Sequence, residues 1–590
     1  MRFVALVLFG CAAASAQYLT ILPPSLDATG QTVFFGSSSF SPDGTRRPLD
    51  IYARDSGGVR LLKHISGGAN STGFGFTISP DGSHLAYTEF TGSAEVLGAV
   101  NLTSGESSVS TCPGPLCDSR SRLHMSADNT IIIGGNHTSQ YSPEIYVANS
   151  DGSFTSLTRG VLAPSTQRVI SGNGLIVFTD DDFSSSNVYV MNLDGGNRQP
   201  LTHFPTVTNA LLGKVAFDAT ISQSGSLVVF TTSNRAQSGF SQIWTVLSDG
   251  LLRNLTRPEE NCQSPSVSAD GTLAAFVCNG QVYVERTDGT ARRALTDFRW
   301  SSAASPVISA DGSRIAFTVG PAANMFASPG AIYSIGTEGT RLEALYAPRV
   351  LNAAGIVDAL TAARPPFIAI GDLITAFGAN FTADTLTVAG QRPLPDTLNG
   401  VALLINGRAV PMLAVTPWQI NAQLPAWIPE GPATFQVRFA DGSASNITTQ
   451  PLVSSAPQVL TLPNDPYPDC QSAVFHAGTG IQANQLHPAT VGEIVEIYAI
   501  GLGPTDPVVL PGMPAPASPP AMAIGPTTVS ISDRLNDVDA PVLFAGLTPG
   551  LIGIYQVNVK VTNGLQGRRS ISLRVKNGPT IGAGCPFWVH

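Results

Sequence analysis

Short apolar stretches separated by turn formers fill the first half of the chain. Triplets such as Leu85-Ala86-Tyr87 and Ile176-Val177-Phe178 each follow closely on a turn such as Ser79-Pro80-Asp81-Gly82. Asp can bond its own backbone two residues on and Gly accepts positive φ, so the chain can reverse tightly there. A second apolar stretch, such as Val188-Tyr189-Val190, leads through another turn to a Leu-Thr pair. The pattern predicts two hairpins, and therefore four strands, in each unit.

This unit repeats between residues 25 and 347. Its most regular position is a turn serine, whose copies lie 47, 45, 51, 46 and 41 residues apart at Ser79, Ser126, Ser171, Ser222, Ser268 and Ser309. Such a period is typical of β-propeller blades. We expect a further copy at 25–30, with one residue inserted, because the similar motif at 40–44 precedes Ile51-Tyr52 and belongs to the middle of its unit. The sequence therefore predicts seven blades, with six as the alternative.

The units resemble the blades of TolB-type (WD-like) β-propellers, which carry a Ser-Pro-Asp-Gly turn, an Ile-x-Phe strand and a closing Leu-Thr pair. Here these motifs appear as Ser79-Pro80-Asp81-Gly82, Ile315-Ala316-Phe317 and Leu201-Thr202. The resemblance implies the fold but no particular activity, because propellers host binding, lyase, hydrolase and scaffold roles. The Asp-Gly pairs are interpreted as turn makers and not as ligands.

The repeat stops near Pro348, and alternating strands continue beyond it. Phe435, Val437 and Phe439 would face one way while Gln436 and Arg438 face the other. Alternation with one polar face indicates antiparallel sandwich sheets. The stretch 348–580 is long enough for two immunoglobulin-like units that meet near Ala456-Pro457.

This second half resembles the Solibacter-type C-terminal domain of uncharacterised secreted bacterial proteins. The matching segments are Leu351-Asn352-Ala353-Ala354, 393–401, Pro417-Trp418-Gln419-Ile420-Asn421, Pro488-Ala489, Gly501-Leu502-Gly503-Pro504 and 545–558. The resemblance implies a common surface or assembly element behind variable exported modules. Cys470 and Cys585 do not belong to these segments, so any bridge between them would be a feature of this chain alone.

The first residues are typical of a secretion signal. Arg2 is followed by an apolar stretch and then by Ala14-Ser15-Ala16, a small-x-small cleavage pattern before Gln17. Lipidation at Cys11 is the alternative. After residue 16 no apolar run approaches the roughly 18 residues that span a bilayer. We therefore expect a signal peptide at 1–16, a propeller at 17–347, one sandwich at 348–456 and a second at 457–590, in an all-β protein of the periplasm, cell surface or exterior.

Composition narrows the range of functions. Only 12% of the 590 residues are charged and the net charge is −9, so a basic nucleic-acid-binding face is not expected. The 58 Gly and 44 Pro suit short strands joined by tight turns.

The cysteines suggest disulfides. Six remain if Cys11 leaves with the signal, and an even number in an exported protein favours bridges. Closeness in sequence pairs Cys112 with Cys117 and Cys262 with Cys278, which leaves Cys470 with Cys585. A metal site is the alternative, but no Cys-x-x-Cys spacing or matching His is present.

Signals for catalysis are missing from the sequence. Neither a Gly-x-Ser-x-Gly elbow nor a His-Glu-x-x-His motif occurs, and we expect no catalytic residue, metal ligand or cofactor. The three carboxylates of 180–182 lack calcium-loop spacing and are interpreted as a solvated loop. Five histidines are scattered over the repeat and could still converge at the propeller axis: His64, His84, His124, His137 and His203.

Two functions remain. The first is a non-enzymatic interaction or scaffold protein of the bacterial envelope or exterior, with the propeller as binding platform for a protein or glycan and the sandwiches as anchor or spacer. The second is an extracellular hydrolase or lyase with its site at the propeller mouth. A mouth lined by Ser, Thr and Ala would favour the first, and a cluster of His and carboxylates would favour the second.

Overall fold

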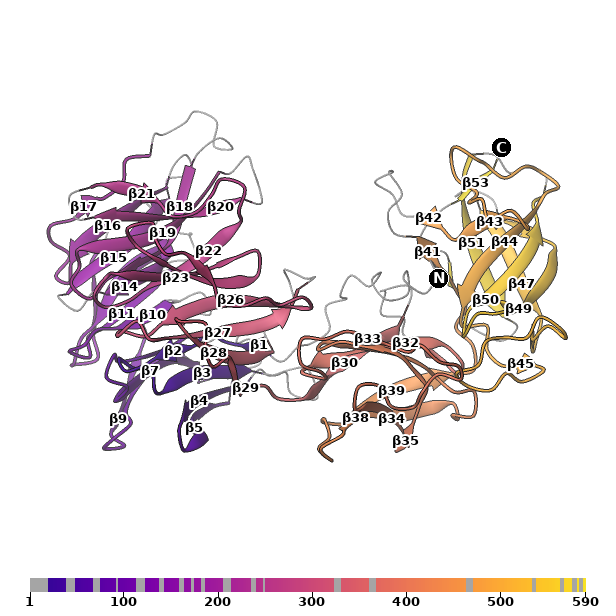
Figure 1. Ribbon diagram of the computed structural model, residues 1–590, viewed down its shortest axis with the longest axis horizontal. Coiled ribbons are helices and arrows are strands. Elements are labelled where there is room, and N and C mark those ends of the chain that lie inside the picture. Colours follow the sequence, from indigo (N-terminus) through magenta and orange to yellow (C-terminus); the bar gives the residue numbers. More distant parts are fainter. Residues whose placement is uncertain are drawn as a thin grey trace. The chain divides into compact units, whose positions relative to one another are not determined.

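The protein is all-β, as its sequence predicted. The computed structural model describes residues 20–38, 48–66, 75–91, 94–112, 122–136, 143–158, 164–170, 174–181, 186–204, 214–234, 240–247, 250–322, 330–359, 368–462, 471–532, 537–562, 567–575, 581–582 and 587–589. In these residues every regular element is a strand, and none is a helix that could cross a membrane. The chain divides into two compact units, Tyr18–Pro348 and Arg349–His590 (Figure 1).

The described strands of the first unit form seven antiparallel sheets, each made of consecutive strands, as in a seven-bladed propeller. Blade 1 comprises β1 (Thr20–Ile21), β2 (Ser25–Leu26), β3 (Val33–Ser38), β4 (Leu49–Asp55) and β5 (Gly58–Ile65). Blade 2 comprises β6 (Phe76–Ile78), β7 (His84–Phe90), β8 (Glu95–Asn101) and β9 (Ser107–Thr111). Blade 3 comprises β10 (Arg122–Met125), β11 (Ile131–Asn136), β12 (Pro143–Ala148) and β13 (Phe154–Ser156).

The remaining blades follow the same order from inner to outer strand. Blade 4 comprises β14 (Pro164–Ile170), β15 (Leu175–Asp181), β16 (Ser186–Asn192) and β17 (Gln199–Pro200). Blade 5 comprises β18 (Lys214–Ile221), β19 (Leu227–Asn234), β20 (Ser241–Leu247) and β21 (Leu252–Asn254). Blade 6 comprises β22 (Cys262–Val267), β23 (Leu273–Cys278), β24 (Gln281–Arg286) and β25 (Arg293–Ala294). Blade 7 comprises β26 (Ser301–Ile308), β27 (Arg314–Pro321), β28 (Ala331–Gly336) and β29 (Glu343–Tyr346).

The repeated turn joins the inner strand of a blade to the next strand and is held by a buried serine. In blade 2 the Ser79 hydroxyl donates to Asp81 Oδ1 at 2.5 Å and accepts the N–H of His84 at 2.9 Å. Asp81 also accepts the N–H of Ser83, and these bonds lower the pKa of Asp81 to about 2. Ser79 is fully buried, so its side-chain hydrogen bonds satisfy backbone groups that water cannot reach. These groups lie in the turn, where the backbone cannot pair with a neighbouring strand.

Blade 1 has the same turn with the two polar residues exchanged. Asp27 occupies the position that Ser79 has in blade 2. Its N–H donates to the carbonyl of Thr32, and its own carbonyl accepts the N–H of Gly30, and the backbone of Ser79 makes the equivalent two bonds. Thr29 Oγ1 in turn donates to Asp27 Oδ1 at 3.0 Å. This corrects the expected register, since Ser25 lies within β2 and no residue is inserted.

The closing Leu-Thr pair completes the outer strand of a blade. In blade 4 the Leu201 N–H bonds Val188 O at 2.7 Å, while the Thr202 hydroxyl accepts the N–H of the same Val188 at 2.9 Å. Blades 3, 5 and 6 repeat the hydroxyl bond, at 2.9, 3.0 and 2.9 Å, with Thr158, Thr256 and Thr296. A threonine side chain therefore takes the place of a carbonyl where the outer strand ends.

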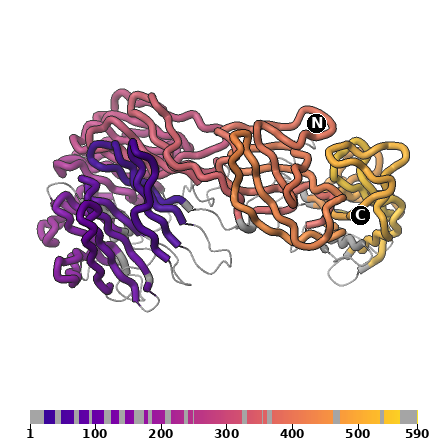
Figure 2. The backbone as a smooth tube through the Cα atoms, turned by 90° about the horizontal axis from the view of Figure 1, so that it is seen from below, coloured from indigo at the N-terminus to yellow at the C-terminus, as the bar shows by residue number. Residues whose placement is uncertain are grey.

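The ring closes between blades 7 and 1 without a shared strand among the described strands. The two blades lie side by side in Figures 1 and 2, and their side chains form one apolar cluster that includes Phe35 and Ile332. Arg314 reaches across to the carbonyl of Gly30 at 3.3 Å. Gly30 has φ +67°, and a Cβ there would lie 2.8 Å from Ser309, so only glycine fits this seam.

The second unit begins with a sandwich of two five-stranded sheets over one core. One sheet has the order β30-β32-β37-β36-β33, with β30 (Val350–Asp358), β32 (Leu373–Ala379), β37 (Gln419–Gln423), β36 (Met412–Val415) and β33 (Thr387–Val388). The other has the order β31-β39-β38-β34-β35, with β31 (Ile368–Ala369), β39 (Thr448–Val453), β38 (Gly431–Phe439), β34 (Val401–Ile405) and β35 (Arg408–Ala409).

A second sandwich follows, with its own core. Its larger sheet contains β40 (Gln458–Val459), β43 (Val474–His476), β44 (Ile494–Ile500), β50 (Tyr555–Lys560), β49 (Val542–Leu547), β46 (Met522–Ala523) and β45 (Thr505–Asp506). The facing sheet contains β48 (Asp537–Ala540), β47 (Thr527–Ser532), β51 (Gly567–Val575), β52 (Ile581–Gly582) and β53 (Phe587–Val589). A small ladder joins β41 (Thr461–Leu462) and β42 (Gln471–Ser472).

The two sandwiches meet at a buried carboxyl. Asp372 is 2% exposed, and its Oδ1 accepts the N–H of Gly501 from the second sandwich at 2.6 Å. Burial, followed by the charge of buried Asp358, raises the pKa of Asp372 well above its usual range. Gln423 Oε1 likewise accepts the N–H of Gly512 at 2.7 Å. The junction is therefore fixed by backbone hydrogen bonds to side chains of the first sandwich.

Loss of the closing threonine hydroxyl tests its role in the blade. We expect Thr202→Val, which keeps the shape but leaves the N–H of Val188 buried and unpaired, to lower the free energy of unfolding by about 1–3 kcal/mol. Denaturant-dependent hydrogen exchange would measure this loss at propeller amides separately from the second unit. Thr103→Val, at an exposed turn position, is the matched control and should change little. Equal effects of the two substitutions would refute the assignment.

The sandwich junction should respond to pH. A carboxyl whose folded pKa is raised stabilises the fold fully below its unfolded pKa of about 3.9, and this stability is lost as the pH rises through the folded pKa. Asp372→Asn keeps the acceptor for Gly501 without the charge. It should therefore flatten the pH dependence of the second unit's unfolding free energy and stabilise that unit at pH 8. Thermal unfolding from pH 4 to 9 measures this, and Asp396→Asn, an exposed carboxylate of the same unit, should leave the dependence unchanged.

Candidate functional site

The candidate site is a cavity of about 520 Å³ on the propeller axis. Six blades contribute lining segments from the ends of their inner strands, at 23–28, 77–80, 123–127, 218–223, 264–269 and 305–310. Serine and threonine hydroxyls alternate there with Pro, Ala, Ile and Val, and none of the described lining residues is aromatic. The surface offered to a ligand is therefore neutral for the most part, with apolar patches between hydroxyl groups.

The inner strands of blades 5, 6 and 7 share an irregularity beside this cavity. Each contains one residue in the left-handed region, with φ of 54° at Asp218, 56° at Ser264 and 47° at Ser305. At each of these residues the pairing with the next strand shifts register. Such a bulge places an extra residue in one strand and leaves it outside the ladder. Three neighbouring blades thus turn additional backbone and side-chain groups toward the axis.

Blade 1 interrupts its inner strand differently. Pro23 and Pro24 separate β1 from β2, and both short strands pair with β3. Proline has no N–H to give to a ladder, so it breaks the strand where it lines the cavity. Pro265 and Pro306 directly follow the left-handed serines of blades 6 and 7 and are buried. The wall combines stiff prolines with bulged backbone, which limits its movement on ligand binding.

The rim of the cavity is formed by the residue that follows the turn serine or its equivalent. Backbone hydrogen bonds connect these residues from blade to blade: Ala28 N–H to Pro80 O at 2.7 Å, Gln223 N–H to Ala269 O at 3.1 Å and Ala269 N–H to Ala310 O at 2.9 Å. Pro80 cannot donate and so does not extend the chain of bonds toward blade 3. The rim is therefore held by main-chain bonds as well as by packing.

Among the described residues, three titratable side chains line the cavity: Asp27, His124 and Asp218. The carboxylate of Asp27 is hydrogen-bonded within its own turn, where it accepts the N–H groups of Gln31 and Thr32. His124 comes from blade 3 and Asp218 from blade 5. In the described part of the chain, a group of three or more His, Cys, Asp or Glu close enough to hold a metal occurs only in blade 6, and its residues do not line the cavity.

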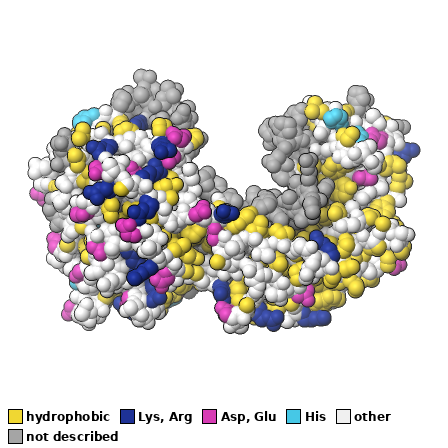
Figure 3. Space-filling view, in the orientation of Figure 1, with side chains coloured by type: hydrophobic (Ala, Val, Ile, Leu, Met, Phe, Trp, Pro, Cys, Tyr) yellow, Lys and Arg dark blue, Asp and Glu magenta, His cyan; other side chains and the backbone are white. Residues whose placement is uncertain are grey.

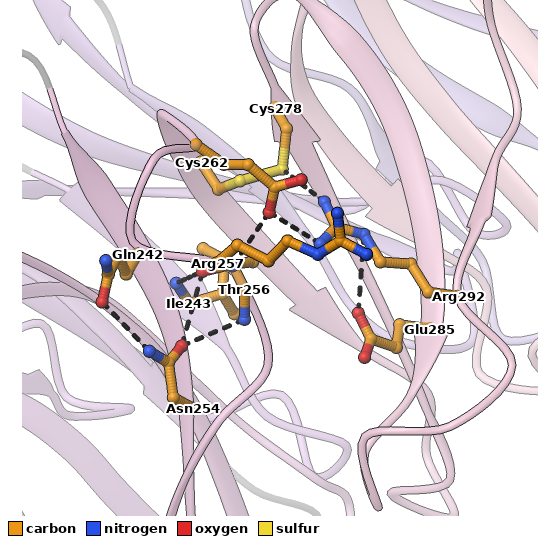
Figure 4. A network of polar contacts seen from close by, with 10 residues as sticks. Gln242, Ile243, Asn254, Thr256, Arg257, Cys262, Cys278, Glu285 and Arg292 are labelled. Carbon is orange, nitrogen blue, oxygen red and sulfur yellow. Dashed lines mark hydrogen bonds and ion pairs between the residues drawn. A yellow bond between two sulfur atoms is a disulfide. The ribbon is translucent and has the colours of Figure 1, made fainter.

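That blade 6 group belongs to a polar network between blades 5 and 6 (Figure 4). Arg292 donates to Glu260 Oε2 at 2.7 Å, approaches Glu285 Oε2 at 3.8 Å and stacks over Tyr283. Burial raises the pKa of Glu285 to about 7, against the opposing effect of Arg292. Beside the network, Cys262 and Cys278 are joined by a disulfide between directly opposed positions of β22 and β23.

The other residues singled out in the sequence lie apart from one another. His64 bonds Asp50 at 2.6 Å, and His84 lies 3.1 Å from Asn101, each on its own blade. His203 follows the outer strand of blade 4. Of the five propeller histidines, four are described, and His124 is the one among them that lines the cavity. His137 lies outside the described residues.

The predicted carboxylate cluster and the other cysteines are only partly described. Asp180 and Asp181 end β15, whereas Asp182 lies outside the described residues. Cys112 is buried and disulfide-bonded. Its expected partner Cys117, together with Cys11, Cys470, Cys585 and the segment 1–16, lies outside the described residues. The pairings Cys112–Cys117 and Cys470–Cys585 stay predictions.

Solved structures with a similar fold include TolB from Acinetobacter baumannii (16% identity, TM-score 0.31, 48% of this chain and 65% of that one). A second is an oligogalacturonate lyase in complex with manganese (16% identity, TM-score 0.38, 55% of this chain and 94% of that one). A third is a puromycin-hydrolysing peptidase of Mycobacterium tuberculosis (12% identity, TM-score 0.41, 62% of this chain and 59% of that one). This chain thus spans less than two thirds of the TolB and peptidase chains. At such identities and TM-scores the likeness concerns the fold and says nothing of activity.

The sequence matches no protein-family model and no curated protein. The resemblance of the second unit to Solibacter-type domains therefore stays a prediction.

The cavity wall was missed by sequence reasoning, which began each unit at its turn. A signal was present in Ser264-Pro265 and Ser305-Pro306, each four residues before a turn serine. Serine followed by proline within an expected strand marks a break in the ladder.

Proposed function

We propose that this protein is an exported, non-enzymatic interaction protein of the bacterial envelope or exterior, which binds a partner at the axial cavity. The observation that carries the proposal is the cavity itself, formed by rigid inner strands and a hydrogen-bonded rim. Its volume of about 520 Å³ falls within the range of about 300–1,000 Å³ of ligand pockets. A preformed wall reduces the ordering cost of binding.

The partner is a protein segment of low charge. Hydroxyl groups such as those of Thr220 and Ser266, set between prolines and aliphatic side chains, suit an extended chain that presents both amide and small apolar groups. A glycan fits less well, because sugar rings pack their C–H faces on aromatic rings, and the described part of the lining contains none. On the propeller face seen in Figure 3, basic and acidic side chains are interspersed, so this face does not favour long-range attraction of a partner with one sign of charge.

Export is supported by the disulfide and by the N-terminal signal pattern. Buried bridges such as Cys262–Cys278 form in oxidising compartments. The sandwiches then act as anchor or spacer. Val508 and Leu510, which follow β45, are 72% and 69% exposed, and Ile524, which follows β46, is 58% exposed. Large exposed apolar side chains of this kind suit attachment to another surface.

Bulky substitutions at the rim test the binding site. Ala127 and Gln223 are exposed rim residues on blades 3 and 5, so tryptophan at either position would cover the cavity without disturbing the core. With the full chain immobilised and exposed to envelope extract, we expect each of Ala127→Trp and Gln223→Trp to reduce partner capture at least about tenfold, or 1.4 kcal/mol. Thr103→Trp, at an exposed turn position outside the cavity lining, is the control and should capture normally.

Two outcomes would contradict the proposal. Capture that is equal in the rim variants and the control would remove the cavity from the interaction. Turnover of a polysaccharide or peptide by the full chain, abolished by the rim variants, would instead establish an enzyme acting at the propeller mouth.

A further inference from the structure

We propose that Glu260, Cys262 and Cys278 bind a divalent cation of the zinc type when the Cys262–Cys278 disulfide is reduced. This site lies in blade 6 and is independent of the binding proposed at the axis. In the reduced protein the cation would take over from the disulfide as the link between strands β22 and β23.

The ligand atoms are already close together. One carboxylate oxygen of Glu260 and the two sulfur atoms lie within 4.8 Å of one another. The cysteines are directly opposed across the ladder, with Cα atoms 4.1 Å apart, so small rotations of their side chains can open room for an ion. Glu260 is positioned by a local turn, in which its Oε2 accepts the N–H of Arg257 at 2.9 Å. Figure 4 shows the disulfide that joins Cys262 and Cys278, with Arg292 beside it.

The charge of the cluster suits a bound cation. Two thiolates and one carboxylate carry three negative charges, and a divalent ion with the nearby Arg292 guanidinium supplies three positive ones. Arg292 already contacts both ligand types, at 2.7 Å from Glu260 Oε2 and 3.3 Å from Cys278 Sγ. Both sulfur atoms belong to buried residues, 0% and 2% exposed, where an unbalanced charge would be costly. Metal binding would therefore balance the charges of the three ligands and Arg292.

The donor set selects the class of ion. Thiolate sulfur and carboxylate oxygen are ligands of zinc, which binds thiolates at about 2.3 Å and is commonly four-coordinate. Three protein ligands leave one position for water. A hard ion such as magnesium would prefer oxygen donors alone.

The redox step balances with an external reductant. A trialkylphosphine and one water convert the disulfide to two thiols and one phosphine oxide. Binding of the divalent ion then releases both thiol protons to solvent. Since the sulfur atoms are buried, reduction is to be carried out on the full chain in denaturant, followed by refolding without oxygen.

Cobalt(II) is the probe, because thiolate ligation gives it charge-transfer absorption in the near ultraviolet. Refolded, reduced full chain should bind one more equivalent of cobalt than the Cys262→Ser/Cys278→Ser double variant, which retains all other cysteines. Glu260→Gln should weaken this binding at least about tenfold. The neighbouring exposed Glu259→Gln is the control and should bind normally. Zinc should displace the cobalt and raise the unfolding temperature of the reduced chain but not of the oxidised one.

Other results of these experiments would contradict or support the metal site. Equal cobalt binding by the wild-type chain and the double variant would overturn the proposal. So would normal binding by Glu260→Gln, or a reduced chain that fails to refold both with and without zinc. Refolding that requires zinc in the wild-type chain, but not in the oxidised protein, would support it.

Discussion

The buried serine of the inter-strand turn is the constraint on which the propeller depends. Its hydroxyl satisfies a backbone N–H at the innermost end of the blade, where no further strand is available to accept it. In blade 2 this bond joins Ser79 to His84, and the carboxylate of Asp81 holds the hydroxyl in place. Because the next turn residue, Pro80, forms part of the cavity rim, the same bond that reverses the chain also places the binding surface. In blade 2 the fold and the site are thus set at one position.

Cations stacked on aromatic rings recur in the propeller, and Lys63 of blade 1 lies 5.0 Å from the ring centroid of Tyr87 in blade 2. Arg292 stacks on Phe276 and Tyr283 in blade 6, and Lys214 lies 4.2 Å above the ring of Trp244 in blade 5. A cation held against a ring face stays partly desolvated, and burial accordingly lowers the pKa of Lys214. These contacts recur with different residues in different blades.

The parts of the fold that depend on local chemistry could be predicted from the sequence. Turns such as that of Ser79 and Asp81, and the bridge between Cys262 and Cys278, involve residues that are near in sequence and carry their own signals. The first turn was assigned to the wrong residues, because Asp27 and Thr29 exchange the usual roles of serine and aspartate while making equivalent bonds. A pattern of residue types does not reveal such an exchange, whereas the hydrogen bonds do.

The site and the sandwich junction could not be predicted in this way. The left-handed conformation of Asp218 follows from its place in a bulged strand beside the axis, and nothing in the neighbouring residues requires it. Asp372 resembles any turn aspartate in the sequence, yet it is buried by a segment that contains Gly501, more than a hundred residues further on. The boundaries between the sandwiches, their immunoglobulin-like character and the export signal stay predictions.

The closure of the ring without a shared strand has a consequence for how such a chain changes over generations. Every described blade is one contiguous stretch, and the turn serines recur at intervals of 41 to 51 residues. Tandem duplication or loss of one interval would therefore add or remove an entire sheet and leave neighbouring sheets whole. In a ring whose closing blade combines strands from both ends of the propeller sequence, the first and last repeats would instead share one sheet. In this architecture, recombination between repeats could change the number of blades one at a time. A ring of any new size would then have to form again the contact between its first and last blades, which here joins Gly30 and Ser309.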